Sequence, residues 1–150
     1  MLVYRIGKTE YARDLEGTGA KLYGGRWNHI GTPCIYTSES RALAVLEFLV
    51  NVNIDFMPKS LSIATLEIDE KRINTVPVKD LPENWQHIPA PSPTKDLGSR
   101  LLDKNVAIIK VPSVVIEDEY NYIINPLAGS RFLKLVEVKD FVYDVRIRKN

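Results

Sequence analysis

The chain has 150 residues, a formal net charge of +1 and one cysteine. This length suits one domain with its own hydrophobic core, and the balanced charge argues against a nucleic-acid binder that works through a broad basic face. No window approaches the ~20 apolar residues of a membrane-spanning helix, and the N-terminus lacks the layout of a signal peptide. We therefore expect one soluble, cytoplasmic domain over residues 1–150.

The N-terminal part predicts a strand over residues 2–6, followed by a glycine-rich passage from residue 17 to residue 31. A GxG pattern occurs in this passage, but without the strand–loop–helix context or the GK[ST] motif of a phosphate-binding loop. Gly24 and Gly25 instead suit a sharp turn of the backbone immediately before Arg26.

A strand–helix pair follows the glycine-rich passage. Residues 32–38 predict a strand that carries Tyr36, and Ser38 or Ser40 is suited to cap a helix that runs to about residue 50. In the run ALAVLEFLV of this helix the only charged residue is Glu47. An all-round apolar pattern is typical of a buried helix, in which an ionised carboxylate is costly unless something pairs with it.

The rest of the chain predicts mostly strands. A proline-rich stretch over residues 77–93 is expected to form a long surface loop, and a short helix follows over residues 95–104 despite Gly98. One early helix followed mainly by strands indicates an α+β domain rather than an alternating parallel sheet. The expected strands cover residues 61–68, 106–116 with an interruption at Pro112, 120–126 and, as one or two strands, 132–147. Pro112 suits the edge or end of a strand or a bulge.

The single cysteine and the two histidines show no catalytic or metal-binding pattern. Cys34 lies in an apolar segment without a basic partner nearby, so we expect a buried structural thiol in a reducing compartment. His29 and His87 lack the spacing of metal ligands, so no metal site is expected.

Arg26, Tyr36 and Glu47 are the candidate site residues that the spacing itself provides. An arginine suits a phosphate group, a tyrosine offers a ring face and a hydroxyl, and a lone buried glutamate stabilises a developing positive charge. Together they suit a ribosyl phosphate whose glycosidic bond is broken, of which NAD is the commonest example. The alternative is an internal Arg26–Glu47 ion pair beside a core tyrosine, and spacing alone favours this simpler interpretation.

Three segments of the chain resemble the RES domain family along nearly its full length. The family is named for an Arg, a Glu and a Ser, which here would be Arg26, Glu47 and Ser113, with Tyr36 as a further matching position. The resemblance implies a single RES domain over residues 1–150. The segments are GGRWNHIGTPCIYTSESRALAVLEFL, LGSRLL and VPSVVIEDEYNYIINP.

The resemblance implies an α+β, ADP-ribosyltransferase-like fold, with two packed, mostly antiparallel sheets and flanking helices around a NAD cleft. It implies a toxin of a bacterial toxin–antitoxin system that depletes NAD+ by hydrolysis or phosphorolysis of the nicotinamide–ribose bond and so arrests growth. NAD+ would be the substrate, and no separate cofactor is expected. The implied partners are an Xre-type helix-turn-helix antitoxin and a second copy in a homodimer, with no direct nucleic-acid or membrane partner.

The resemblance also implies a role for each matching residue. Arg26 would bind the NAD+ phosphates, Tyr36 would stack against nicotinamide or orient it, and Glu47 would stabilise the positive charge that develops as nicotinamide leaves. Ser113 would hydrogen-bond the ligand or hold Glu47 in place; without the resemblance it is simply a serine at a strand end. Asn125 is a further candidate for ligand binding.

The chain departs from the family pattern after Asn125. Many members have a run similar to His-Pro-Asp after the Asn-Pro pair, whereas this chain has Leu-Ala-Gly-Ser at residues 127–130. Ser130 is a candidate substitute polar group. Two other functions stay open: a mono-ADP-ribosyltransferase that modifies a host protein, and a non-enzymatic binding module in which Arg26 and Glu47 simply pair.

Overall fold

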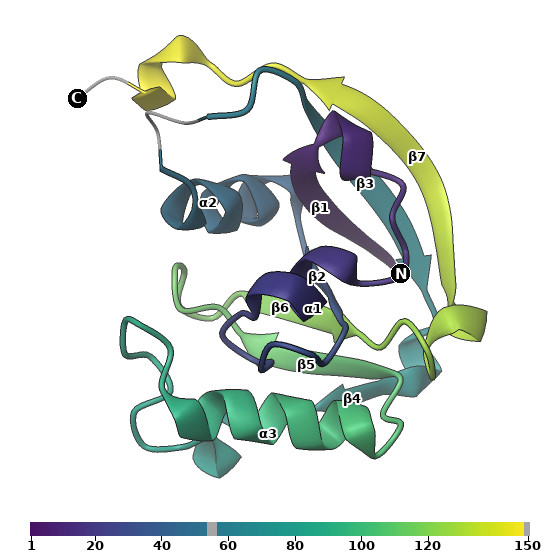
Figure 1. The fold of residues 1–150 in the computed structure, drawn as a ribbon, viewed down its shortest axis with the longest axis vertical. Helices are drawn as coiled ribbons and strands as arrows, with labels where there is room; N and C mark the ends of the chain where they lie inside the picture. Colours follow the sequence, from purple (N-terminus) through teal and green to yellow (C-terminus); the bar gives the residue numbers. More distant parts are fainter. Residues whose placement is uncertain (54–56, 149–150) are drawn as a thin grey trace.

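The computed structural model describes residues 1–53 and 57–148. Within them, seven strands form one sheet in the order β4-β5-β6-β2-β1-β3-β7 (Figure 1). The strands are β1 (Leu2–Lys8), β2 (Ile35–Ser38), β3 (Leu61–Ile68), β4 (Ile73–Thr75), β5 (Ile108–Pro112), β6 (Tyr120–Ile124) and β7 (Leu133–Phe141). The α-helices are α1 (Thr18–Tyr23), α2 (Arg41–Asn51) and α3 (Ser92–Asp103), and short 3₁₀ helices cover Thr9–Tyr11, Glu70–Arg72, Val78–Asp80, Ser130–Phe132 and Val145–Arg148.

The sheet has two halves that meet at one pair of residues. Strands β1 and β2 are in register only at Tyr4 and Ser38, whereas β1 pairs with β3, and β3 with β7, along most of their lengths. All pairs are antiparallel except β4 with β5. A core cluster joins both halves, with Val3 and Leu66 from one and Ile108 and Ile124 from the other. The α+β class is confirmed, and the two sheets that we expected are two packed halves of one continuous sheet.

The opposite face of the sheet is covered by α2 and α3. Leu102 of α3 packs in a second core cluster with Ile109 and Ile123 of the central strands, while α2 contacts β1 and β2. Figure 1 shows α2 beside β1 and α3 beside β4 and β5. Because Tyr4 and Ser38 are register partners, they face the same side of the sheet, and that side is the one on which α2 lies, with Arg41 stacked over the Tyr4 ring.

The local signals placed several elements correctly. The strands expected at residues 2–6 and 61–68 form, the second with the expected bounds. Ser40 caps α2, because its side chain accepts a hydrogen bond from the Leu43 amide at 3.1 Å. The expected glycine turn also forms: Gly24 ends α1 with a φ of 70°, which is a left-handed conformation that favours glycine.

One expectation about burial was wrong, and two expected strands are shorter than their expected ranges. Helix α2 is not buried on all sides: Leu46 is 39% and Val50 61% exposed, because the helix lies on the sheet and only one side is covered. The strand expected over residues 106–116 ends at Pro112, the residue where an interruption was expected. Of the one or two strands expected over residues 132–147, one forms: β7 ends at Phe141, and a 3₁₀ helix follows at Val145–Arg148.

The proline-rich segment is more than a surface loop. Trp85 is 8% exposed and packs on Trp27 with 6.2 Å between the ring centroids. Helix α3 begins three residues earlier than expected, with a proline in its first turn. Gly98 in this helix has a packing reason, because a Cβ there would overlap the carbonyl oxygen of Trp27. No helix in residues 1–53 and 57–148 is long and apolar enough to cross a membrane.

Candidate functional site

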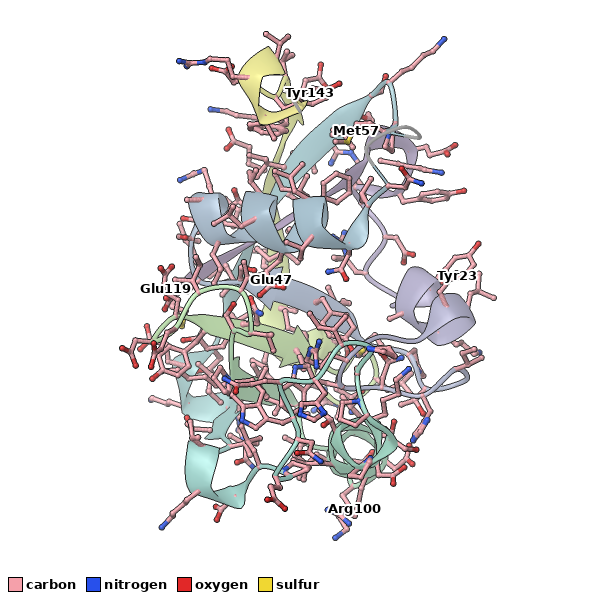
Figure 2. All side chains as sticks on the ribbon, turned by 90° about the vertical axis from the view of Figure 1, so that its left-hand side faces the viewer. Tyr23, Glu47, Met57, Arg100, Glu119 and Tyr143 are labelled. Atoms are coloured by element: carbon pink, nitrogen blue, oxygen red, sulfur yellow. The ribbon has the colours of Figure 1, made fainter. Side chains whose placement is uncertain are left out.

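Glu47 lies where α2 meets the start of β6 and the end of β5. Figure 2 shows its side chain directed from α2 toward the strands, beside the loop that carries Glu119, whereas Tyr23 and Arg100 lie away from it. Glu47 is partly buried rather than enclosed. The helix therefore holds the carboxylate at the margin of the packed region, where a ligand can reach it.

Two side chains donate hydrogen bonds to one oxygen of this carboxylate. Glu47 Oε1 accepts from Ser113 Oγ at 2.7 Å and from Asn121 Nδ2 at 2.7 Å. Ser113 follows β5 directly, and its hydroxyl also accepts hydrogen bonds from the amides of Val115 and Ile116. Among the described residues, no hydrogen bond reaches Oε2 of Glu47, so this oxygen is available to a ligand.

Arg26 occupies the middle of a tight turn on a neighbouring segment. The turn is closed by the Gly25 amide, which donates to the Asn28 carbonyl at 3.1 Å. Arg26 Nη1 donates to the carbonyl oxygens of Trp85 at 2.7 Å and His87 at 2.9 Å. The proline-rich segment thus anchors one nitrogen of the guanidinium, and no bond from the described residues occupies the other two nitrogens.

Tyr36 and Asn28 hold this turn in place. The Tyr36 hydroxyl donates to Asn28 Oδ1 at 2.7 Å and accepts from the Trp27 amide at 3.0 Å. Burial raises the pKa of Tyr36 well above its ordinary value, so the hydroxyl keeps the proton that it donates. The Tyr36 hydroxyl therefore positions the turn that presents Arg26, which leaves the ring as the part that a ligand could contact.

Arg26 and Glu47 do not form an ion pair. Each has the other partners described above, and the salt bridges found among the described residues do not include them. Partial burial lowers the pKa of Arg26 from its ordinary value, and the negative charge of Glu47 opposes this shift. The two charges are thus near enough to interact electrostatically but remain separate, so the internal ion pair that spacing favoured is wrong.

Asn125 lies apart from Glu47, beyond the other end of β6. It is 4% exposed, and its Nδ2 donates to the Leu102 carbonyl at 3.0 Å. Its Oδ1 accepts from the amides of Leu127 and Ala128 at 3.0 and 3.2 Å. These bonds close the turn after β6, and a role for Asn125 in ligand binding stays a prediction.

Ser130 belongs to the same turn as Asn125. Its exposed hydroxyl donates to the Leu127 carbonyl at 3.2 Å. The structure therefore does not bring Ser130 to Glu47, and its role as a substitute polar group also stays a prediction.

Cys34 is the buried structural thiol that the sequence predicts. It is 2% exposed, and burial raises the pKa of its thiol to about 12. A thiol with so high a pKa is a poor nucleophile at neutral pH, because the thiolate is the reactive form.

The sequence analysis missed Asn121, Ser38 and Asn28. All three are polar and directed toward packed elements, and Asn28 is fully buried. Asn121 stands two residues before Ile123 and so on the same inward face of β6, and a polar residue at such a position is the signal that was available.

Two open hollows of about 530 and 630 Å³ lie elsewhere, both bordered by Lys71 and Phe132. Neither includes a predicted site residue, so the expected NAD cleft stays a prediction. No group of three or more potential metal ligands occurs within residues 1–53 and 57–148.

Comparison with known proteins identifies the family of the chain. The family model described as RES domain matches residues 2–146. A protein named Toxin Res from Photorhabdus laumondii is 37% identical, over 99% of this chain and 98% of its own length. A protein named Prs ADP-ribosylating toxin from Sphingobium sp. is 35% identical, over 95% of this chain and 92% of its own length.

Among solved structures, a chain of the M. tuberculosis MbcT–MbcA toxin–antitoxin complex has a similar fold. The TM-score is 0.70 over 93% of this chain and 83% of that chain, at 18% sequence identity. At this identity the likeness concerns the fold alone.

Proposed function

The chain belongs to the RES domain family, and from this membership and its site geometry we propose that it is the toxin of a bacterial toxin–antitoxin system that cleaves the nicotinamide–ribose bond of NAD+. The observation that carries the proposal is the carboxylate of Glu47, which is held at one oxygen by Ser113 and Asn121 and forms no salt bridge with a cation in residues 1–53 and 57–148. Such a carboxylate is suited to stabilise positive charge on a ligand.

The reaction places positive charge where Glu47 can act on it. As the bond between the pyridinium nitrogen and the anomeric carbon breaks, its electron pair leaves with nicotinamide, which becomes neutral. The ribose then takes on oxocarbenium character, and a preorganised negative charge near it lowers the barrier. An acceptor oxygen bonds to the anomeric carbon and gives its proton to solvent.

Arg26 is suited to bind the pyrophosphate of NAD+. Its Nη1 is anchored to the carbonyls of Trp85 and His87, which leaves Nε and Nη2 as a planar pair of donors. This pair matches the spacing of two phosphate oxygens. The anchoring lowers the conformational entropy that the side chain loses when the ligand binds.

The acceptor distinguishes the candidate activities. Water would make the protein an NAD+ glycohydrolase and phosphate an NAD+ phosphorylase. A protein acceptor would make it a mono-ADP-ribosyltransferase, which the name of the Sphingobium relative favours. A non-enzymatic module based on an Arg26–Glu47 pair has lost its structural basis.

The proposed partners follow from the same relationship. A relative of similar fold occurs in a toxin–antitoxin complex, and we include in the proposal an antitoxin of the Xre helix-turn-helix type, a homodimeric toxin and action in the cytoplasm. Size-exclusion chromatography with light scattering, with and without the product of a neighbouring small gene, tests the first two.

The decisive experiment measures nicotinamide release from NAD+ by the purified, antitoxin-free protein. Three parallel reactions contain buffer alone, added phosphate, or cell extract with radiolabelled NAD+. Free ADP-ribose, ADP-ribose phosphate and a labelled protein band identify the three acceptors. A folded preparation that releases no nicotinamide under any of these conditions contradicts the proposal.

A further inference from the structure

Asn121 makes two hydrogen bonds through its side-chain amide, and both go to other side chains. Its Nδ2 donates to Glu47 Oε1 at 2.7 Å, and its Oδ1 accepts from Ser38 Oγ at 2.7 Å. Ser38 is 4% exposed. Ser38 and Asn121 are direct register partners on β2 and β6, so the sheet itself brings their side chains together on one face.

The chemistry of the neighbours selects one orientation of this amide. If the amide were flipped, Oδ1 would face Oε1 of Glu47, and two acceptors would oppose each other without a proton between them. In the observed orientation the Ser38 hydroxyl gives its proton to Oδ1, and Nδ2 points to the carboxylate. The two bonds polarise each other in the same direction, from Ser38 through Asn121 to Glu47.

Ser113 is constrained in the same way on the other side. Its hydroxyl accepts from the amides of Val115 at 3.0 Å and Ile116 at 3.1 Å, so its own proton is directed to Glu47. Both donors therefore converge on Oε1. A glutamate side chain has three rotatable bonds and a broad terminal torsion, and two donors on one oxygen fix that torsion and direct Oε2 away from them.

We infer that Asn121, oriented by Ser38, is a positioning residue that sets the direction of the Glu47 carboxylate and leaves Oε2 for the ribose. This inference rests on the proposed function for its kinetic consequence. Ser38 acts only through Asn121, because its hydroxyl reaches Asn121 and not the carboxylate. Because Ser38 contacts Glu47 only through Asn121, the effect of substituting Ser38 should depend on whether Asn121 is present.

The kinetic experiment is a double-substitution cycle on nicotinamide release. Asn121→Ala should lower kcat about 100-fold, the effect of losing one positioned donor. Ser38→Ala should lower kcat about 10-fold, the effect of losing one hydrogen bond. Neither should change the KM for NAD+ more than about 3-fold, because the phosphates bind elsewhere.

The double variant and two controls give the sharper readout. In the Asn121→Ala background, Ser38→Ala should cost no further kcat, because the residue through which Ser38 acts is gone. Ser38→Thr keeps the hydroxyl and should restore most of the activity lost in Ser38→Ala. Asn74→Ala, at an exposed position on β4, is the matched control and should behave as the unsubstituted protein. Additive effects of Ser38→Ala and Asn121→Ala overturn the inference.

A second measurement does not depend on the reaction. In NMR spectra, the Asn121 side-chain amide proton bonded to Glu47 should resonate downfield and exchange slowly with solvent. Glu47→Ala and Ser38→Ala should each return it to the range of free amides, and Ser38→Thr should not. If the protein releases no nicotinamide but this pattern holds, the proposed function fails and the positioning contact stands; an amide resonance unaffected by Ser38→Ala overturns the inference whatever the activity.

Discussion

The two ends of the β2–β6 pair use asparagine in opposite ways. At one end, Asn121 faces Ser38 and bonds to the Glu47 carboxylate, whose other oxygen accepts no hydrogen bond from the part of the chain that the structure describes. At the other end, where Ile35 faces Ile124, the amide of Asn125 bonds to backbone groups on both sides and closes a turn. Both asparagines belong to the segment YNYIINP.

This difference distinguishes a residue of the candidate site, Asn121, from a residue that stabilises the fold, Asn125. Asn125 is buried, and its side-chain bonds all go to backbone groups, so substitution there should affect stability. Side-chain partners make Asn121 part of a chain of contacts that ends at a group able to act on a ligand. We therefore expect substitutions at the Ser38–Asn121 end to change turnover, and substitutions at the Ile35–Ile124 end to change the free energy of unfolding.

The largest effect is expected for Glu47→Gln, at the Ser38–Asn121 end. The substitution removes the charge that stabilises the oxocarbenium-like state while keeping the volume and an acceptor for both donors, so kcat should fall by about 1,000-fold or more. Glu67→Gln, at an exposed position of β3, is the matched control. Unfolding by urea should show both variants close to the unsubstituted protein; a loss of several kcal/mol for Glu47→Gln would point to a structural role.

Arg26→Lys should have the next largest effect, and mainly on binding. Lysine cannot donate to Trp85 and His87 while presenting a planar pair of donors to a pyrophosphate, so the KM for NAD+ should rise about 30-fold with a smaller change in kcat. Arg100→Lys, exposed on α3 and distant from Glu47 in Figure 2, serves as the control. A fall in kcat with an unchanged KM would assign Arg26 to the chemical step instead.

Asn125→Ala tests the Ile35–Ile124 end. It removes three hydrogen bonds from a buried turn, at about 1 kcal/mol each, which should lower the free energy of unfolding by about 2–3 kcal/mol. The Leu102 carbonyl keeps its bond from the Asn105 amide. At a temperature where the variant is folded, kcat should stay within about 2-fold of the unsubstituted value. A loss of turnover comparable to that of Asn121→Ala would remove the distinction between the two ends.

Cys34, next to Ile35 at this end, should have the smallest effect, which is a pH dependence of the free energy of unfolding. Burial raises its pKa from 9.0 to about 12, so the folded state holds the proton to a higher pH than the unfolded chain. The resulting stability is fully present below about pH 9 and is lost as the pH rises toward about 12, on the order of 1 kcal/mol per pH unit. Between about pH 8 and about pH 10.5, the free energy of unfolding measured in urea should fall less for Cys34→Ala than for the unsubstituted protein.

The comparison with Cys34→Ala isolates the thiol from other groups. Tyr36, whose pKa is also raised by burial, contributes in the same direction but is present in both proteins. At neutral pH Cys34→Ala should leave kcat unchanged. Equal alkaline destabilisation of the two proteins would show that Cys34 does not carry the effect.

Much of the fold was predictable because its signals are local. Alternation over β3, the serine cap of α2 and the glycine at the end of α1 each depend on a few consecutive residues. The burial of α2 depends on packing instead. Its sequence predicts a helix buried on all sides, but α2 lies on the sheet and only one of its sides is covered. The reason for Gly98 lies in Trp27, 71 residues earlier in the chain.

The candidate site divides in the same way. Arg26, Glu47 and Ser113 were predicted from residue type, spacing and family resemblance, and the structure brings Glu47 and Ser113 into contact. Asn121 was missed, although a polar residue on the inward face of a strand was a usable signal. The partners of Arg26 could not be predicted, because they are backbone carbonyls that the sequence does not specify.

By itself the sequence predicted which residues could carry chemistry, indicated the RES family, and located the starts of β1, β3 and β6 and the cap of α2. Tertiary structure decided which polar groups are satisfied and which remain open. It placed Asn121, 74 residues from Glu47 in the chain, against one carboxylate oxygen. It also brought the guanidinium of Arg26 to a backbone carbonyl of the proline-rich segment. The physical reason is that hydrogen-bond partners depend on strand register and helix docking, which bring distant segments together, whereas capping, alternation and turn preferences act over a few neighbouring residues.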